Sequence, residues 1–261
     1  MAKQRSIWSK MLSQGLLVAA LLIIWEMIAW SKIYPELLFP PVEKIMAAFG
    51  TDAAEMIKRT WTSVYAILIG LGLAIGIAVV AAALSMVSRV VGEAMVGLMA
   101  IMHPLPGIAV LPIIILWLGS GSESIIALIT FSAVWPLIAN IHAGLRAVPP
   151  IQLEVGRNLG LKGIKLVWSI MLPASLPYIL TGLRVAWARS WQASVAAEMV
   201  FGAAGGQGGL GWYLYKKRFF MEIPAVFAGM TIIIALGMAI EYLLFNGLET
   251  VTIRRWKMTV D

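Results

Sequence analysis

The stretch that decides the fold is residues 145–177, LRAVPPIQLEVGRNLGLKGIKLVWSIMLPASLP. One apolar run ends just before it at Gly144, and another begins just after it at Tyr178. A connector between neighbouring helices usually needs only about 2 to 8 residues. This one is much longer and interleaves apolar with polar side chains at helical spacing. We therefore expect a folded segment between two membrane-spanning helices.

Two short amphipathic helices are predicted inside residues 145–177. The pair Pro149–Pro150 begins the first helix, and Gly160 follows it where a left-handed cap residue ends many helices. The second helix is predicted over residues 163–171, and Pro173 is expected to end it. Two such helices at a sharp angle would form a compact projection that can fill a socket on a partner.

The composition of the whole chain is that of a membrane protein. Of the 261 residues, 61% are apolar and 13% are charged, against roughly 25% charged in soluble domains. We therefore predict one all-α integral membrane domain over residues 1–261. The net charge of +7 is expected to set topology and lipid contact, with no nucleic-acid binding. Because the chain has no cysteine, disulfide bonds and cysteine-metal sites are excluded.

Apolar runs near the ~20 residues that cross a bilayer predict six transmembrane helices. They lie at about residues 11–30, 64–86, 94–118, 124–144, 178–201 and 223–247. The first run follows basic residues as in a signal peptide, but it lacks a small-residue cleavage site and ends in Trp30, so we predict an uncleaved span. Residues 40–58 show helical spacing that suits either an amphipathic interfacial helix or an ordinary connector.

Two of the predicted spans carry packing signals. Gly70, Gly72 and Gly76 in the second span predict a close helix–helix approach, and Gly72 and Gly76 are one turn apart. The third span is interrupted by Pro104, Pro106 and Pro112, which predicts a kinked or broken helix whose freed carbonyls need partners.

The distribution of lysine and arginine predicts the orientation. If the amino terminus is cytoplasmic, the loops on that side, including residues 145–177, carry more of these residues than the opposite loops. We therefore expect both termini to be cytoplasmic.

Residues 145–177 also carry a recognisable pattern. Glu154 begins it, Gly160 follows, and Ile170 with the Leu172–Pro173 pair closes it. This spacing resembles the EAA loop of the transmembrane permease subunits of binding-protein-dependent ABC importers. Both alanines of that motif are replaced here, by Val155 and Gly156.

The resemblance extends along nearly the whole chain. Within the permeases it is most similar to the aliphatic sulfonate, taurine, nitrate and bicarbonate group. The stretches that carry this similarity are residues 116–119, 144–146, 172–177, 181–184 and 197–199.

The resemblance implies a type I importer permease with six transmembrane helices in a bacterial inner membrane. Two copies would form a dimer, bind two cytoplasmic ATPase subunits that carry ATP and Mg, and receive a small, anionic solute from an extracytoplasmic substrate-binding protein. No cofactor is expected on this chain, which would not itself be an enzyme. The residues expected in the ATPase-coupling loop are Glu154, Gly156, Gly160, Leu161, Ile170, Leu172 and Pro173.

Polar groups and helix breaks within spans are candidates for the translocation pathway, because they are costly in lipid. The candidates are His103, Pro104, Pro106, Asn140, Arg189 and Glu198. Arg189 could attract an anion or form an internal ion pair, and His103 could line the pathway or be an ordinary core residue. Arg184, nearer the cytoplasmic end, is expected to snorkel or to contact the loop.

The glycine-rich residues 205–211 resemble a phosphate cradle only superficially, since no Gly-Lys-Ser/Thr follows. We expect a flexible periplasmic loop there, without ATP binding. Together with Trp212 and the basic residues 216–218, it could receive the binding protein or anchor the chain at the membrane interface.

Two other function classes are less consistent with the sequence. A secondary carrier driven by an ion gradient has no need of the 145–177 projection. An intramembrane enzyme would require catalytic motifs, and neither Gly-x-Ser-x-Gly nor His-Glu-x-x-His is present.

Overall fold

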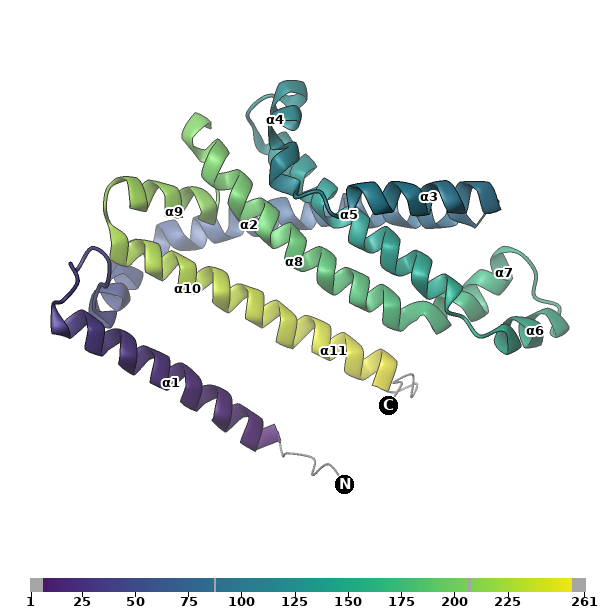
Figure 1. Cartoon of the computed structure of the whole chain (residues 1–261), viewed down its shortest axis with the longest axis horizontal. Helices are drawn as coiled ribbons and strands as arrows, with labels where there is room; N and C mark the ends of the chain where they lie inside the picture. Colours follow the sequence, from purple (N-terminus) through teal and green to yellow (C-terminus); the bar gives the residue numbers. More distant parts are fainter. Residues whose placement is uncertain (1–6, 87, 206–207, 255–261) are drawn as a thin grey trace.

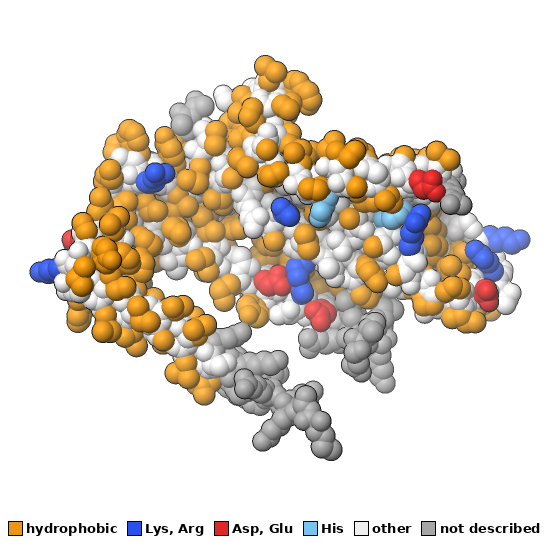
Figure 2. All heavy atoms as spheres, viewed as in Figure 1, with side chains coloured by type: hydrophobic (Ala, Val, Ile, Leu, Met, Phe, Trp, Pro, Cys, Tyr) orange, Lys and Arg blue, Asp and Glu red, His pale blue; other side chains and the backbone are white. Residues whose placement is uncertain are grey.

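The fold was analysed in a computed structural model that describes residues 7–86, 88–205 and 208–254 (Figure 1). Within these ranges the chain forms helices and connecting turns and contains no β-strand. The predicted all-α class is therefore confirmed. Apolar side chains cover most of the face seen in Figure 2, as expected for a surface in contact with lipid.

Eleven α-helices and three π-helical turns make up the described part of the chain. The α-helices are α1 (Ile7–Ser31), α2 (Val42–Ser85), α3 (Arg89–Met102), α4 (Gly107–Leu118), α5 (Ser122–Arg146), α6 (Pro150–Asn158), α7 (Ile164–Leu166), α8 (Leu172–Gly205), α9 (Leu210–Phe219), α10 (Ile223–Ala239) and α11 (Asn246–Glu249). The π-helical turns are Val167–Met171, Ile240–Phe245 and Thr250–Arg254.

Four helices among the described residues are long and apolar enough to cross a bilayer. They are Val42–Ser85, Ser122–Arg146, Ile164–Phe201 and Ile223–Thr252. The pair α3 and α4 adds a fifth span if the two are counted together. Helix α1 occupies the first predicted span, and its apolar stretch Gly15–Ser31 is at the lower limit of the length that crosses a bilayer. The structure thus supports four or five spans, and the count of six stays a prediction.

The third predicted span is broken, as its prolines indicated. Helix α3 ends at Met102, α4 begins at Gly107, and their axes are bent by 99°. Pro106 immediately precedes α4 in an extended conformation. The break leaves α4 beside α5 while α3 packs on both α2 and α5.

Two predicted helix boundaries were wrong. Residues 40–58 form neither a separate interfacial helix nor a connector, because α2 runs unbroken from Val42 to Ser85 and no proline lies inside it. Pro173 does not end the second loop helix, which continues into α8. The π-helical turn Val167–Met171 comes just before this proline, and its wider winding accommodates the missing N–H group.

The core is built from α2, α5 and α8, which pack along their lengths. Of the three glycines that predicted a close approach on α2, Gly70 makes it, whereas Gly72 and Gly76 are exposed. A Cβ placed on Gly70 would lie 2.5 Å from Cγ2 of Ile129 on α5. Buried alanines at 74, 78 and 82 continue the same face. Small side chains at this four-residue spacing let the two backbones approach.

Helix α1 stands apart from the other helices along much of its length (Figure 1). It is held near its C-terminal end, where Nε1 of Trp25 donates to the carbonyl oxygen of Pro40 at 3.0 Å. The Glu26 carboxylate accepts from the Val42 N–H at 3.0 Å, at the first turn of α2. The Trp25 ring also packs on Phe227 of α10 with ring centroids 5.0 Å apart.

We expect Gly70→Val to destabilise the protein by about 1–3 kcal/mol, because the added atoms have no space against Ile129. Gly72→Val is the matched control, since nothing lies within 4 Å of its Cβ position. The measurement is the temperature at which each detergent-solubilised variant loses its monodisperse peak in size-exclusion chromatography. Equal temperatures for the two variants would contradict the Gly70 contact.

Candidate functional site

The segment 145–177 folds as two helical pieces held together by Gly156. A Cβ on this glycine would lie 2.6 Å from Cδ1 of Leu166 and 3.0 Å from Cγ1 of Ile170. No larger residue fits without moving those side chains. The replacement of an alanine by Gly156 therefore has a structural reason, which is the close packing of α6 on the start of the next helix.

Gly160 ends α6 as the sequence predicted. Its φ of +80° lies in the left-handed region that favours glycine. The N–H of Leu161 donates to the carbonyl oxygen of Gly156 at 3.0 Å, and the N–H of Gly160 donates to that of Arg157 at 2.9 Å. These two bonds form a Schellman motif, which fixes the direction in which the chain leaves α6.

The remaining residues predicted in this segment fall into two groups. Ile170 packs inside against Gly156, and Leu161 is half-buried. Leu172 and Pro173 form the first residues of α8 and connect the segment rigidly to that helix. Glu154 is exposed on α6.

An apolar patch is exposed on this segment, at the end of the molecule where α6 and α7 project beyond the other helices (Figure 1). Its members share high exposure: Ile151 64%, Val155 49%, Leu159 73%, Ile164 68% and Trp168 65%. We call this set the loop patch. Ile151, Val155 and Leu159 recur every four residues along α6, so they form one continuous face. Such a face indicates a protein contact.

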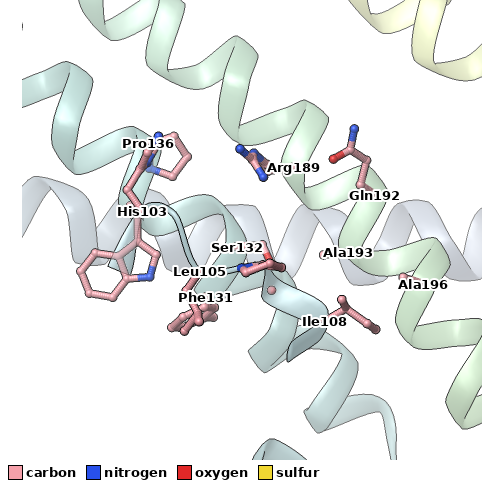
Figure 3. A pocket seen from close by; sticks show the side chains of 13 residues that line it. His103, Leu105, Ile108, Phe131, Ser132, Pro136, Arg189, Gln192, Ala193 and Ala196 are labelled. Atoms are coloured by element: carbon pink, nitrogen blue, oxygen red, sulfur yellow. The ribbon is translucent and has the colours of Figure 1, made fainter. Parts of the chain in front are cut away.

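A cavity of about 210 Å³ lies at the break between α3 and α4 (Figure 3). The predicted residues His103, Pro106 and Arg189 all line it. The structure thus brings Arg189 together with two pathway candidates that are far from it in the sequence. Helix α8 supplies Arg189, and the broken third span supplies the other two.

Two of the lining residues that the sequence analysis missed, Gln192 and Ser132, carry polar side chains. Gln192 follows Arg189 by one helical turn and lines the same cavity, so the i, i+3 rule would have found it. Ser132 on α5 also lines it and lies against Gly107, where a Cβ would be 2.1 Å from its Oγ. No sequence signal singles out Ser132, because it depends on how α4 folds onto α5.

Two other pathway candidates do not line this cavity. Nδ2 of Asn140 donates to the carbonyl oxygen of Pro136 at 2.8 Å, and its Cβ lies against Gly182 of α8. Pro104 lies in the turn between α3 and α4 but is not part of the cavity wall.

Glu198 is buried, with 1% of its surface exposed. Its carboxylate accepts hydrogen bonds from Oγ of Ser63 at 2.8 Å, Oγ of Ser194 at 3.0 Å and the N–H of Gly211 at 2.8 Å. It also borders a second cavity of about 580 Å³ between α2, α5 and the segment at Gly208. The contacts of this carboxylate join α8, α2 and the start of α9.

The glycine-rich stretch was expected to be a flexible loop, and its described part differs. From Gly208 onward it is buried, and Leu210–Phe219 forms helix α9. Ser63 Oγ accepts from the Leu210 N–H at 2.9 Å, and Arg59 donates to the carbonyl oxygen of Gly208 at 2.7 Å. Side chains of α2 and α8 therefore form hydrogen bonds with the backbone groups of this glycine-rich stretch. Residues 206 and 207 lie outside the described residues.

The basic run 216–218 is largely occupied by acidic partners. Lys217 Nζ lies 2.7 Å from Asp52 and 2.5 Å from Glu222, and Lys216 Nζ lies 3.1 Å from Glu55. Burial alone would lower the pKa of Lys217, but its hydrogen bonds to Asp52 and Glu222 outweigh this and raise it. This ammonium group therefore stays charged at neutral pH and links α9 to α2.

Tyr213 belongs to the same cluster and donates its hydroxyl to Asp52 at 2.8 Å. Burial and this hydrogen bond raise the pKa of Tyr213 above its usual range. Of the three basic residues in the run, Arg218 is the exposed one.

Arg184 pairs with the last helical segment of the chain. Its Nε lies 3.0 Å from Glu241, and an Nη lies 3.5 Å from Glu249. The expected contact with the 145–177 segment is therefore replaced by a contact between α8 and the C-terminal helices.

We expect Glu198→Ala to loosen the start of α9, because it leaves buried hydroxyl and N–H donors without an acceptor. The cost should be about 1–3 kcal/mol per unsatisfied donor. Limited proteolysis near residue 208 measures the effect, and Glu198→Gln, which keeps an acceptor oxygen, should be affected less. Identical digestion of the two variants would refute this role.

Comparison with known proteins gives a consistent set of relatives. The family model described as "Binding-protein-dependent transport system inner membrane component" matches residues 70–257. A putative ABC transporter permease protein of Methanocaldococcus jannaschii is 31% identical, covering 86% of this chain and 85% of its own length. The taurine transport system permease protein of Escherichia coli is 29% identical, covering 86% and 82%. The nitrate import permease protein of a Synechocystis strain is 28% identical, covering 82% and 80%.

Proposed function

The chain belongs to the family of inner membrane components of binding-protein-dependent transport systems and is an ABC importer permease, and from this premise we propose that its cargo is a small anionic solute. The observation that carries the proposal is the chemistry shared by its relatives. Their names specify taurine, aliphatic sulfonates, nitrate and bicarbonate. Each of these solutes carries a group with several negatively polarised oxygen atoms, for which an unpaired arginine in the pathway is a suitable partner.

The family implies an ATPase and a substrate-binding protein as partners. We propose that two cytoplasmic ATPase subunits bind ATP and Mg, and that each receives the loop patch of one permease copy in a surface socket. The exposed apolar side chains of Ile151, Leu159 and Trp168 support this contact, since they would otherwise face water. Glu154 supplies an adjacent charge for a basic group of the ATPase. The permease then hydrolyses no ATP itself.

The loop is well placed to transmit motion. Helix α8 continues directly from the loop through Pro173 to the cavity wall at Arg189. A displacement of the loop by the ATPase would therefore tilt or rotate the whole helix. We propose that this motion opens the pathway alternately to the two sides of the membrane. The pathway includes His103, Pro106 and Arg189, and Pro104 lies in the turn beside them. Asn140 and Glu198 contact neighbouring helices.

We further propose six membrane spans, with α1 as the first, a dimer of two permease copies, and both termini in the cytoplasm. The basic residues near the loop support this orientation by the positive-inside rule. The binding protein would dock at the opposite end, where α9 and the turn before α10 expose Arg218, Phe219 and Phe220.

We expect Leu159→Asp to abolish recovery of the ATPase with the tagged permease, because a charge in the loop patch cannot enter an apolar socket without desolvation. Leu37→Asp is the matched control: the same change at another exposed leucine, in the connection between α1 and α2. The measurement is purification in mild detergent from the native host, with the co-purifying chains identified by mass spectrometry. An unchanged ATPase yield for Leu159→Asp would overturn the coupling contact. Recovery of the unmodified chain alone, with ion-driven uptake, would favour a secondary carrier.

We expect Gly160→Val to reduce ATP-driven uptake at least tenfold while the protein remains inserted and folded. Valine has space there, but the left-handed backbone costs it about 1–2 kcal/mol, so the exit from α6 would change direction. Gly97→Val, on α3 with free space around it, controls for the added side chain. Uptake is measured in proteoliposomes with the ATPase and the binding protein. Normal uptake by Gly160→Val would contradict a coupling role for this turn.

A further inference from the structure

Arg189 is an exposed cation within the span Ile164–Phe201. It forms no ion pair or hydrogen bond with any other residue of the described ranges. Arg184 on the same helix, in contrast, is matched by Glu241 at 3.0 Å. An unmatched guanidinium at membrane depth is costly in lipid, so such residues face water-filled cavities or bind an ion.

The cavity beside Arg189 offers hydrogen-bond donors and no carboxylate. Gln192 lies one turn further along α8, is exposed, and its amide makes no hydrogen bond within the part of the chain that the structure describes. Figure 3 shows Arg189 and Gln192 extending from the same helix, with His103 on the other side of the cavity. None of the residues that line the cavity is aspartate or glutamate. The local charge is therefore positive and favours an anion.

Much of the remaining wall is apolar. Its apolar side chains include Phe131 of α5 and Ile108 of α4, together with Leu105 and with Ala193 and Ala196, which lie on α8 beside Arg189. The cavity volume of about 210 Å³ leaves room beyond a bare inorganic ion, since a water molecule occupies only about 30 Å³ of the liquid. A ligand that fills this space carries a short apolar body as well as a charged group. The N-terminus of α4, at Gly107, adds its partial positive charge to the same wall.

We propose that this cavity is a transient binding site for a small organic oxyanion, such as a short-chain sulfonate or carboxylate. Arg189 and Gln192 donate hydrogen bonds to the oxyanion, and Phe131, Ile108 and Ala196 contact the apolar body. This inference rests on the proposed function and adds to it the place of binding and the class of ligand. Nitrate and bicarbonate satisfy the charge but leave the apolar wall uncovered.

The lack of cysteine in the chain makes a direct test available. Ala196→Cys places a single thiol at the cavity wall, and Lys58→Cys places one at an exposed position on α2. Each full-length permease, purified with its partners, is labelled with an anionic (ethylsulfonate) and a cationic (ethyltrimethylammonium) methanethiosulfonate reagent. We expect the anionic-to-cationic rate ratio for the Ala196→Cys variant to exceed that for the Lys58→Cys variant by about tenfold, from the field of Arg189.

Adding Arg189→Gln should remove this preference, whereas Arg189→Lys should retain most of it. The chosen ligand probes are propanesulfonate and nitrate at equal millimolar concentration. Propanesulfonate should slow labelling of the Ala196→Cys variant several-fold, and nitrate should slow it much less. A rate ratio that does not change with Arg189→Gln would overturn the anion site. Equal protection by the two probes would overturn the role of the apolar wall.

Labelling tests the anion site, and transport tests the importer function, independently of each other. Labelling needs no ATP hydrolysis, so protection by propanesulfonate together with absent ATP-driven uptake would leave the site intact and refute the proposed function. In the reverse case, ATP-driven uptake of a sulfonate that is unchanged by Arg189→Gln would preserve the function and refute the site. Uptake lowered at least tenfold by Arg189→Gln and partly restored by Arg189→Lys supports both.

Discussion

The close packing of α8 on α5 is the contact on which the rest of the structure depends. A Cβ on Gly144 of α5 would lie 2.7 Å from Cβ of Tyr178, and a Cβ on Gly182 of α8 would lie 2.8 Å from Cβ of Asn140. Ala186 is fully buried between the same helices. In a bilayer, helices gain little from hydrophobic burial against one another, so this kind of intimate van der Waals contact has to hold them. The contact holds α8 along α5.

Helix α8 and its continuation carry residues of three separate sites. Its continuation toward Ile164 carries Trp168 of the loop patch, its middle carries Arg189 of the cavity, and its far part carries Glu198. The charged groups along it face different surroundings. Arg184 is paired with the C-terminal helices and Glu198 accepts hydrogen bonds from three groups, whereas Arg189 faces a cavity. Because structural partners already occupy the first two, Arg189 is the charge left available for a solute.

The break between α3 and α4 shows how an irregular backbone and function are connected here. The prolines indicated a broken helix, and the 99° bend places the N-terminus of α4 next to α5 and α8. Gly107 lies against Ser132 of α5, whose hydroxyl would have to move if a side chain were added. A helix that ran straight would leave no cavity beside Arg189. The non-helical backbone between α3 and α4 is tolerated because it contacts protein and lines a cavity, so its polar groups need not be exposed to lipid.

The sequence alone determined the class of the protein, the family, the loop 145–177 with its Gly160 cap, and the interruption of the third span. These follow from local rules. An apolar composition indicates a protein surrounded by lipid, glycine permits a positive φ, and proline lacks an N–H group. Only the tertiary structure decided which of the three glycines on α2 makes the close contact, that α8 continues through Pro173, and that Glu198 anchors α9. It also decided that Arg189 shares a cavity with His103 and Gln192. Which face of a helix meets which neighbour depends on residues distant in the chain, and no local pattern contains that information.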